Sequence, residues 1–488
     1  MVKEIMPVYF SSNSLVKQQL DSYNKFALEG IQEIVDSVAQ IKTNVEGFEI
    51  KLGKVKLSQP RFYEVRGGYR NIFPSEARIR NITYAAPVFL EMMPIYNNVE
   101  TNRYADIFVG EIPVMSKSVL CHTNQMSKEE LVDIGEDPMD PGGYFIINGS
   151  ERVLVSLEDL VPNKVMTIKE DKGAVSSKMF SVHHGFRARC VIKRSADGTW
   201  MVDFPSSPNG MSLFSLIRAI GVKKDIDVEE LFDMEMLSIK NDVLFNIEND
   251  PSKGAEEDPE LYVAKRFSPG QPKEYQITRL NYLMDNYLLP HLGTQPAMRK
   301  RKILYLAKMA SRTTLVASGK MSADDRDHYG NKRVKLAGDL MGELFRYAFN
   351  YLIKDIVYQA SRADVRGRKL QVHTIVRQDA LTDRILYSMA TGNWVAGQTG
   401  VSQLLDRISY LSSLSHRRRV ISPLTKKHPH FKARDLHGTH YGKLCPSETP
   451  EGPSTSIVKN MAMFCEITTG YSDREVEDIV KKFGIEEE

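Results

Sequence analysis

Hydrophobic residues near the N-terminus repeat first with a helical period and then with a strand period. One set has the spacing of a single buried helical face, and a second set alternates with polar residues as in a half-buried strand. The helical set is Ile31, Ile34, Val35, Val38 and Ile41, and the alternating set is Phe48, Ile50 and Leu52. The sequence therefore predicts a helix over residues 31–41 and a strand around residues 48–52.

A β-hairpin is predicted between residues 144 and 155. Two apolar runs, 144–147 and 153–155, flank Asn148-Gly149. Both of these residues tolerate a positive φ, so the pair favours a tight type I′ turn. We interpret the hairpin as a structural element of the core.

Turn-forming residues cluster from Phe204 to Gly210, and the amino-acid composition of the chain changes there. We interpret this cluster as a linker or domain crossing. The following stretch is more acidic and is predicted to be helical. Residues 249–259 predict a solvated loop, and the basic run Arg299 to Lys302 predicts a solvated helix start.

The last residues predict a well-specified helix. Ser472 and Glu475 have the spacing of a capping box, and Gly484 is suited to end the helix. Its apolar face needs a partner surface in the same domain or in another subunit. That face consists of Val476, Ile479, Val480 and Phe483.

Length and composition indicate a globular protein of two to four domains. The chain has 488 residues, of which 42% are hydrophobic and 26% are charged. No apolar run approaches the ~20 residues of a membrane helix. The first residues lack the apolar core of a secretory signal, so we expect the cytoplasm.

The four cysteines and the net charge exclude little by themselves. Cys121, Cys190, Cys445 and Cys465 form no CxxC pair, which argues against a disulfide framework and a four-cysteine zinc site. A net charge of +3 does not predict a nucleic-acid binder. The distribution of the charge is more informative than its sum.

The window from His416 to Lys443, which we name the basic strip, is the most unusual part of the sequence. It holds eight Lys and Arg residues, five of the eleven histidines and a single acid, Asp435. Such a cluster repels itself unless an anion lies nearby, and phosphate is the usual anion. The alternative is a flexible, solvated loop. The basic residues are Arg417, Arg418, Arg419, Lys426, Lys427, Lys432, Arg434 and Lys443.

A proline-rich loop, residues 445–453, follows the basic strip directly. Three prolines in nine residues exclude a helix or a central strand and predict a stiff, preorganised surface. Glu448 and Glu451 have three alternative roles, as acids, metal ligands or backbone caps, and we favour either caps or salt bridges to the adjacent arginines. His437, His440 and Cys445 match no standard zinc spacing, so we predict no metal there.

A second polar cluster contains Asp324, Asp325 and Asp327. Three carboxylates are suited to bind Mg²⁺, whereas Arg326 and the nearby Lys332 and Arg333 are suited to neutralise them. We interpret the cluster as a structural ion-pair network. The sequence contains no GxxxxGK[ST] loop, HExxH motif or GxSxG elbow, so it indicates nucleic-acid contact and not complete catalysis.

Several segments, in one order, resemble the second-largest, beta-like subunit of multisubunit DNA-directed RNA polymerases. The resemblance covers nearly the whole chain. It is closest to the N-terminal piece of this subunit, termed B″, which some methanogenic archaea carry as a separate chain. The segments are 76–84, 142–154, 324–333, 390–394, 400–403, 414–419, 439–453 and 458–460.

This resemblance implies an α+β multidomain fold, a protrusion with an inserted lobe, followed by a fork region. The protrusion would comprise residues 1–204 and 331–388, and the lobe residues 205–330. The fork would comprise residues 389–462, and the external region would start at 463–488. The implied partners are the complementary C-terminal piece, termed B′, the largest subunit (A′/A″), smaller assembly subunits, DNA template and RNA.

The resemblance also implies site residues but no catalytic residue, metal ligand or bound cofactor in this chain, because the catalytic Mg²⁺ ions would belong to the largest subunit. Thr391 to Gly400 would be the first fork loop, and Lys426 to Arg434 the second. The residues implied to contact nucleic acid are Ser415, His416, Arg418, Arg419, Lys426, Lys427, Lys432 and Arg434. Those implied to lie near the RNA 3′ end and the nucleotide are Arg434, Glu448, Pro450 and Glu451.

Two departures from the family pattern matter. Arg417 stands where related sequences usually carry leucine, so we expect its side chain to face solvent or nucleic acid. Ser454, Thr455 and Ser456 replace a stretch that usually contains Asn and Gly, so we assign them no role. Two rival hypotheses are a free-standing nucleic-acid-binding protein and an independent nucleotidyltransferase that uses Asp324, Asp325 and Asp327.

Overall fold

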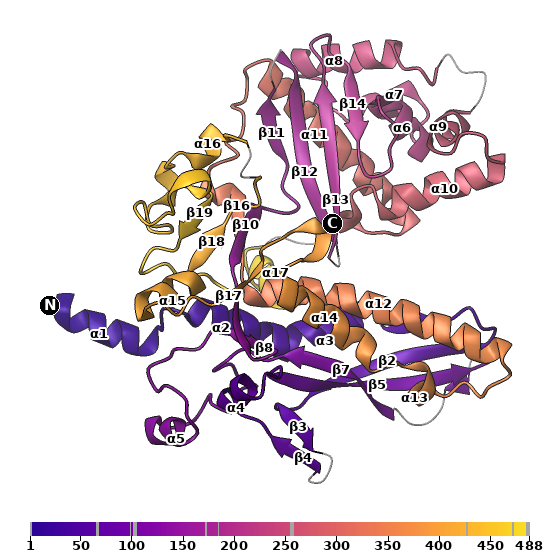
Figure 1. Ribbon diagram of the computed structural model, residues 1–488. Helices are drawn as coiled ribbons and strands as arrows, with labels where there is room; N and C mark the ends of the chain where they lie inside the picture. Colours follow the sequence, from indigo (N-terminus) through magenta and orange to yellow (C-terminus); the bar gives the residue numbers. More distant parts are fainter. Residues whose placement is uncertain are drawn as a thin grey trace. The chain divides into compact units, whose positions relative to one another are not determined.

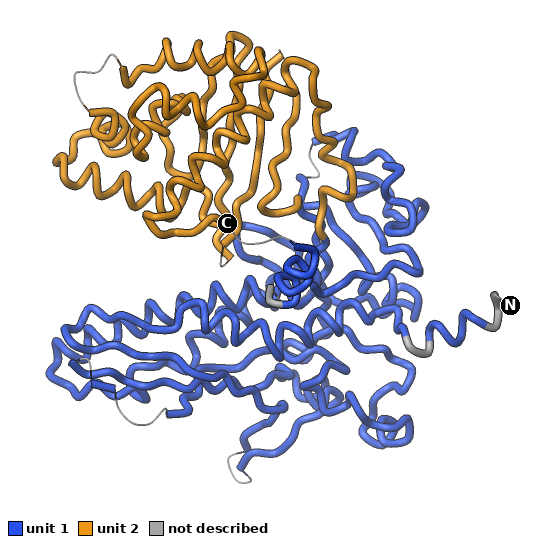
Figure 2. The backbone as a smooth tube through the Cα atoms, turned by 180° about the vertical axis from the view of Figure 1, so that it is seen from behind, with its two compact units in different colours: residues 1–159, 334–488 blue, residues 160–333 orange. Residues whose placement is uncertain are grey.

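The computed structural model describes residues 2–64, 68–97, 99–100, 105–170, 173–183, 185–253, 258–425, 428–470 and 473–484. The chain forms two compact units (Figure 2). Unit 1 comprises residues 1–159 and 334–488, and unit 2 comprises residues 160–333. Both units combine helices with sheets, which confirms the α+β class.

The N-terminal part of unit 1 is helical and leads into the first sheet. The helix face predicted over residues 31–41 exists, but α3 ends at Asp36 and a positive φ at Ala39 turns the chain. Ile41 therefore lies in strand β1, where the prediction placed it in the helix. The elements are α1 (Val2–Ser12), α2 (Lys17–Lys25), a π-helical turn (Phe26–Gly30), α3 (Ile31–Asp36), β1 (Gln40–Lys42) and β2 (Phe48–Leu57).

The main sheet of unit 1 is antiparallel and has the order β1-β2-β5-β6, with β7 also paired to β5. The predicted strand around residues 48–52 is confirmed as part of β2. The remaining elements here are β3 (Arg61–Glu64), β4 (Gly68–Asn71), α4 (Pro74–Ile79), β5 (Ala85–Tyr96), β6 (Val99–Glu100), β7 (Ala105–Pro113) and α5 (Lys128–Asp133).

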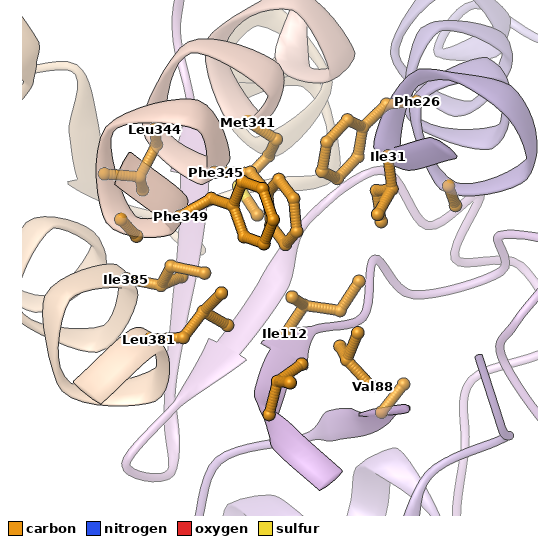
Figure 3. Packing of buried hydrophobic residues seen from close by; sticks show 14 of the residues in the cluster. Phe26, Ile31, Val88, Ile112, Met341, Leu344, Phe345, Phe349, Leu381 and Ile385 are labelled. Atoms are coloured by element: carbon orange, nitrogen blue, oxygen red, sulfur yellow. The ribbon is translucent and has the colours of Figure 1, made fainter. Parts of the chain in front are cut away.

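Two helices from the second half of unit 1 cover this sheet (Figure 1). They are α12 (Ala337–Val365) and α14 (Asp379–Thr391), and the short α13 (Val372–Ile375) lies between them in sequence. Figure 3 shows Phe345 and Phe349 of α12 directed toward Ile112 of β7 and Val88 of β5. Burial of this apolar face, rather than helix propensity, stabilises the long helix.

The predicted hairpin over residues 144–155 is confirmed. It consists of β8 (Phe145–Ile147) and β9 (Ser150–Leu154), and β17 (Ser402–Leu404) adds a third antiparallel strand beside β9. Asn148 and Gly149 have φ values of 48° and 75°, as a type I′ turn requires.

Unit 2 packs helices on one antiparallel sheet of order β11-β12-β13-β14-β15. Its apolar core includes Trp200, which stacks with Phe214 and Phe232. The strands are β11 (Met166–Lys169), β12 (Val175–His183), β13 (Phe186–Arg194), β14 (Trp200–Asp203) and β15 (Met211–Ser212). The helices are α6 (Leu213–Ile220), α7 (Asp225–Glu229), α8 (Leu237–Glu248), α9 (Pro259–Phe267), α10 (Lys273–Asn286) and α11 (Arg299–Ala317).

The turn-rich segment 204–210 does not separate the compact units. It connects β14 to β15, which are neighbours in one sheet of unit 2. The interpretation of this segment as a domain crossing is therefore wrong for the compact units, which divide near residues 160 and 333. The reason is that a turn signal marks a change of chain direction and not the edge of a core. The names protrusion, lobe and fork stay predictions.

Two further sequence predictions have mixed outcomes. The basic run begins α11 as expected, but Lys302 is buried and donates to the carbonyls of Met284 and Asp285. Burial lowers the pKa of Lys302 to about 8. The C-terminal helix is confirmed as α17 (Asp473–Lys482), whereas Ser472 and part of the predicted 249–259 loop lie outside the described residues.

None of the helices formed by the described residues is long and apolar enough to cross a membrane.

Candidate nucleic-acid interface

The basic strip begins at a helix-to-strand junction in unit 1. Helix α15 (Tyr410–Arg417) starts at Ser409, whose side chain accepts a hydrogen bond from the amide of Ser412. Strand β18 (Arg419–Ile421) follows after one residue and lies between β10 (Ser156–Leu160) and β19 (Val458–Asn460). This change from helix to strand gives Arg417, Arg418 and Arg419 three different environments.

Arg417 points inward, so its predicted exposure to solvent or nucleic acid is wrong. Its side chain is 1% exposed and forms an ion pair of 2.9 Å with Asp140. It also donates to the carbonyls of Gly142 and Ser413 at 2.6 and 2.9 Å. The Nε and Nη1 donors of the guanidinium thus bind protein oxygens, so the buried charge is both paired and hydrogen-bonded.

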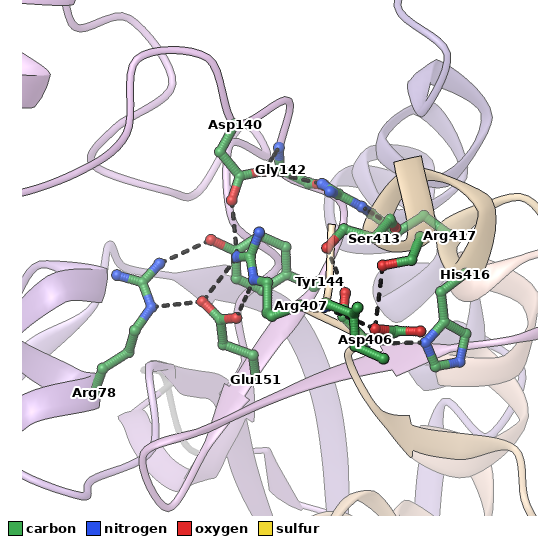
Figure 4. A network of polar contacts seen from close by, with 12 residues as sticks. Arg78, Asp140, Gly142, Tyr144, Glu151, Asp406, Arg407, Ser413, His416 and Arg417 are labelled. Carbon is green, nitrogen blue, oxygen red and sulfur yellow. Dashed lines mark hydrogen bonds and ion pairs between the residues drawn. The ribbon is translucent and has the colours of Figure 1, made fainter. Parts of the chain in front are cut away.

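Arg407 joins the same network from outside (Figure 4). It bridges Asp140 at 2.9 Å and Glu151 at 2.6 Å. Arg78 also pairs with Glu151, at 2.8 Å, and donates to the hydroxyl of Tyr144 at 2.8 Å. Three guanidiniums thus lie 5.0–6.0 Å from the Tyr144 ring.

The electrostatics of this network depend on its full pairing. Burial alone would raise the pKa of the Asp140 carboxyl, but Arg417 and Arg407 hold that pKa below its usual value. Asp140 and Arg407 carried no signal in the sequence, because their partners are more than 250 residues away along the chain. The partners in long-range ion pairs of this kind have no fixed spacing along the sequence.

His416 is buried and uncharged. Its Nδ1 accepts a hydrogen bond from the amide of Asp406 at 3.2 Å, and its Nε2 lies 3.1 Å from the side-chain oxygen of Gln403. Burial and the nearby Arg419 and Arg417 lower the pKa of His416 to about 4. His416 therefore orders the chain before α15 and adds no positive charge to the surface.

Arg418 is also buried, with 8% of the residue exposed. It donates to the carbonyls of Leu15 at 2.6 Å, Ala462 at 2.5 Å and Met463 at 3.3 Å. These bonds tie the N-terminal helices to the segment after β19. The first three residues of the basic strip, 416–418, are therefore buried.

Arg419 differs from its two neighbours. It is half-buried on β18, where its backbone pairs with Asn460, and within the described residues its side chain donates no hydrogen bond and forms no ion pair. The carboxylate of Asp406 is close enough for Arg419 to contribute to its lowered pKa, after a larger effect of the Ile408 amide. Arg419 thus presents an available guanidinium beside a fixed strand.

Ser415, Glu448 and Asn460 form a polar group near this strand. The Ser415 hydroxyl donates to the Glu448 carboxylate and lies 3.3 Å from the side-chain oxygen of Asn460. Asn460 in turn donates to the backbone carbonyl of Glu448 at 3.1 Å. The structure therefore brings Ser415 and Glu448 together, as residues predicted from two different motifs.

Hydrogen bonds from side chains hold the proline-rich loop in place. Arg434, at the end of α16 (Phe431–Arg434), donates to the carbonyls of Pro429, Thr455 and Pro453 at 2.6–3.0 Å. Thr449 accepts from the amide of Ser456 at 2.8 Å and donates to Val458. These bonds support the predicted stiffness of the loop, which stays a prediction.

Pro450 and Glu451 lie exposed on this loop. Among the described residues no ion pair joins Glu448 or Glu451 to an arginine, so the predicted salt bridges are wrong. The Arg434 side chain donates to backbone carbonyls instead. Lys432 is exposed, whereas Lys426 and Lys427 lie outside the described residues.

Lys459 forms a buried ion pair that sequence reasoning did not predict. Its ammonium lies 2.8 Å from Glu158 and 2.9 Å from the hydroxyl of Ser422, which itself donates to Glu158. This triad joins β10, β18 and β19 from inside, so the strand that carries Arg419 is fixed on both sides.

The acidic cluster belongs to unit 2 and forms ion pairs, as predicted. Asp324 pairs with Arg312 at 2.8 Å and accepts from the amide of Thr167, and Lys332 lies 3.7 Å from Asp327. The partner of Asp324 is thus Arg312 and not Arg326. Within the described ranges, no group of three or more His, Cys, Asp or Glu side chains is placed to hold a metal ion.

Comparison with known proteins identifies the family. Residues 14–383 match the RNA polymerase beta subunit family, and residues 403–467 match domain 3 of RNA polymerase Rpb2. The chain is 44% identical over 494 residues to the DNA-directed RNA polymerase subunit Rpo2N of Methanocaldococcus jannaschii, covering 99% of each chain.

Two further relatives differ in length. Rpo2N of Methanococcus vannielii is 44% identical over 490 residues, which cover 99% of this chain and 98% of the relative. Rpo2 of Saccharolobus solfataricus is 44% identical over 484 residues, but this region is 43% of that longer chain. The chain therefore belongs to the RNA polymerase beta subunit family and is similar to the second subunit of archaeal DNA-directed RNA polymerases.

Proposed function

We propose that this chain works within an assembled DNA-directed RNA polymerase and contacts template DNA, the RNA–DNA hybrid and the nucleotide. The contact surface would consist of Arg419, the hydrogen-bonded pair of Ser415 and Glu448, and the exposed part of the proline-rich loop. The catalytic Mg²⁺ ions would come from the largest subunit. The relatives support this proposal, because their names assign them to DNA-directed RNA polymerase.

The observation that carries the proposal is that the Arg419 side chain has no partner among the described residues. The side chains of its two neighbours donate to oxygens inside the protein, whereas the Arg419 side chain has no hydrogen-bond or ion-pair partner among the described residues. A guanidinium held on a rigid strand without a protein partner is suited to a phosphate, which it binds through two parallel hydrogen bonds. The buried groups behind it are the supports, and Arg419 is the contact.

The contact roles that the family resemblance implies for His416, Arg418 and Arg434 are revised within this proposal. Their side chains bind protein atoms, so they would position the surface rather than touch nucleic acid. Lys432, and also Lys426 and Lys427, remain proposed nucleic-acid contacts, and Pro450 and Glu451 remain proposed neighbours of the nucleotide.

The proposed partners are the complementary B′ chain, the largest subunit and the smaller assembly subunits, in the cytoplasm. Mass spectrometry of the native complex tests them, since a polymerase subunit arrives with large partner chains. Isolation of the chain with nucleic acid alone would favour the rival hypothesis of a free-standing binding protein.

Substitution of Arg419 tests the contact surface. In the assembled polymerase, Arg419→Ala is expected to weaken elongation and to lower the salt concentration at which the complex with template and RNA dissociates. Arg419→Lys should recover part of the salt resistance, because it keeps the charge but loses the bidentate geometry. Arg301→Ala, an exposed arginine of unit 2, is the matched control. Salt resistance and elongation equal to those of the control would contradict the proposal.

A further inference from the structure

A second basic feature lies at the other end of unit 1, around the C-terminus of α12. A cavity of about 400 Å³ is lined there by four cations, Arg362, Arg366, Arg368 and Lys369, with the polar side chains of Gln359 and Thr374. No sequence motif identified this cavity. We name it the α12 basic cavity.

The four cations are not neutralised within the described part of the chain. None of them forms an ion pair or donates a side-chain hydrogen bond there. The only acid between residues 359 and 375 is Asp364. Four like charges around one cavity raise its affinity for an anion, because each one repels the others.

The backbone holds these cations in a defined arrangement. The amide of Gly367 donates to the backbone carbonyl of Asp364 at 2.8 Å, and the amide of Arg368 donates to that of Ala363 at 2.9 Å. Gly367 has a φ of 62°. This is the Schellman pattern, which ends a helix in a fixed geometry. The hydroxyl of Tyr96 on β5 donates to the carbonyl of Leu370 and ties the loop to the main sheet.

Stabilisation of the helix end explains only part of this charge. A cation in the last turn interacts favourably with the negative end of the helix dipole, and Arg362 is in that turn. Arg368 and Lys369 lie beyond the last helical residue, Val365, where the helix already has its Schellman cap. Their positions around the cavity point to a ligand.

The lining indicates which ligand fits. It contains no aromatic ring on which a base stacks, and its apolar part is limited to Ala363 and Ile375. A protein partner usually needs a larger apolar centre. Arginine, lysine, threonine and amide side chains are the usual contacts to phosphate oxygens.

We infer that the α12 basic cavity binds the phosphate backbone of duplex DNA at a site separate from the basic strip. This inference rests on the proposed function, since it places the DNA of the polymerase against a second surface of the chain. The side chain of Gln19 accepts from the amide of Ala337, at the start of α12, and donates to the carbonyl of Arg417 in the basic strip, whereas the cavity lies at the opposite end of the same 29-residue helix. That helix is about 43 Å long.

The salt dependence of duplex binding by the assembled polymerase tests the inference. The probe is a fluorescent mixed-sequence DNA duplex, titrated at a series of KCl concentrations. Arg366→Ala/Arg368→Ala should lower the slope of log K against log salt by about 2, since each lost phosphate contact removes about 0.9. Arg366→Lys/Arg368→Lys should restore the slope.

The controls separate this inference from the proposed function. Arg61→Ala/Arg301→Ala removes two exposed arginines that do not line the cavity and should leave the slope unchanged. Elongation on a short RNA–DNA scaffold should remain normal in the cavity variant and be impaired only by Arg419→Ala. A slope equal to that of the control overturns the inference, and so does loss of an acidic protein partner with unchanged DNA binding. Either result leaves the Arg419 assay to decide the proposed function.

Discussion

Three consecutive arginines show how one type of residue serves two purposes. Arg417 and Arg418 are buried and replace lost hydration with protein oxygens, whereas Arg419 keeps its donors available. The difference comes from the junction of α15 and β18, because a helix and a strand direct successive side chains differently. At this scale, composition measures how many cations are present and not which of them reach a ligand.

Removal of Arg417 is expected to destabilise the fold. Arg417→Leu would leave the buried Asp140 with the partly exposed Arg407 and the Gly142 amide, and breaking a buried pair costs about 3–5 kcal/mol. Urea unfolding measures this loss. The double variant Arg417→Leu/Asp140→Asn should recover part of it, because the uncompensated charge is removed. A single variant as stable as Arg301→Leu would contradict the structural role.

The depressed pKa of His416 makes stability depend on pH. The unfolded imidazole binds a proton near pH 6.5, whereas the folded one does so only at about 4. The unfolded chain therefore binds more protons between these values, and the free energy of unfolding falls as the pH drops through this window. The full effect is about 3 kcal/mol.

Unfolding measured between pH 7 and pH 5 checks this expectation. The variant His416→Asn, which has no titrating group, should show a shallower fall than the unchanged chain. Equal slopes for the two would mean that His416 titrates normally in the folded protein.

At the scale of elements, local patterns succeeded where local chemistry decides the outcome. The Asn148-Gly149 turn, the strand at residues 48–52 and the C-terminal helix were predictable, because turn conformation and periodicity are encoded within a few residues. The ion pairs of Asp140 and Glu158 were not, and neither was the identity of the Asp324 partner, since these partners approach only when the chain folds. The same limit applies to Ile41, whose apolar character suits a helix and a strand equally.

The packing of α12 on α2 depends on one glycine. A Cβ at Gly338 would lie 1.9 Å from the carbonyl oxygen of Ser22, and the Gly338 amide donates to the Ser22 hydroxyl at 2.9 Å. Gly338→Ala should therefore destabilise the chain by about 1–3 kcal/mol despite the higher helix propensity of alanine.

The matched control for Gly338 lies one turn further along the same helix. A Cβ at Gly342 would meet only Phe26, at an ordinary 3.7 Å. Gly342→Ala should thus be neutral or slightly stabilising in thermal unfolding. Equal effects of the two alanine substitutions would show that α12 does not rest on α2 as described.

At the scale of the whole molecule, the two compact units each have their own core and one of the two tryptophans. Trp200 is buried in unit 2, and Trp394 is buried in unit 1. Units with separate cores are able to unfold separately. The family relationship covers parts of both units, since residues 14–383 match a single family.

Tryptophan fluorescence tests whether the units unfold separately. Trp394→Phe leaves only Trp200 as a reporter, and its urea transition should coincide with the loss of the unit 2 signal in the unchanged chain. We expect the unchanged chain to show two transitions. A single transition with the same midpoint in both proteins would mean that the units unfold as one.

Helix α12 starts near Arg417 of the basic strip and ends at the α12 basic cavity, so its length sets the distance between these two regions. At about 3.4 Å per base pair, its roughly 43 Å equal about 12 to 13 base pairs, slightly more than one helical repeat of the duplex. A straight duplex lying along the helix would therefore complete one turn plus about a fifth of a turn between the two ends. Insertion of half a repeat between two fixed anchor points on the DNA would place one of them out of phase.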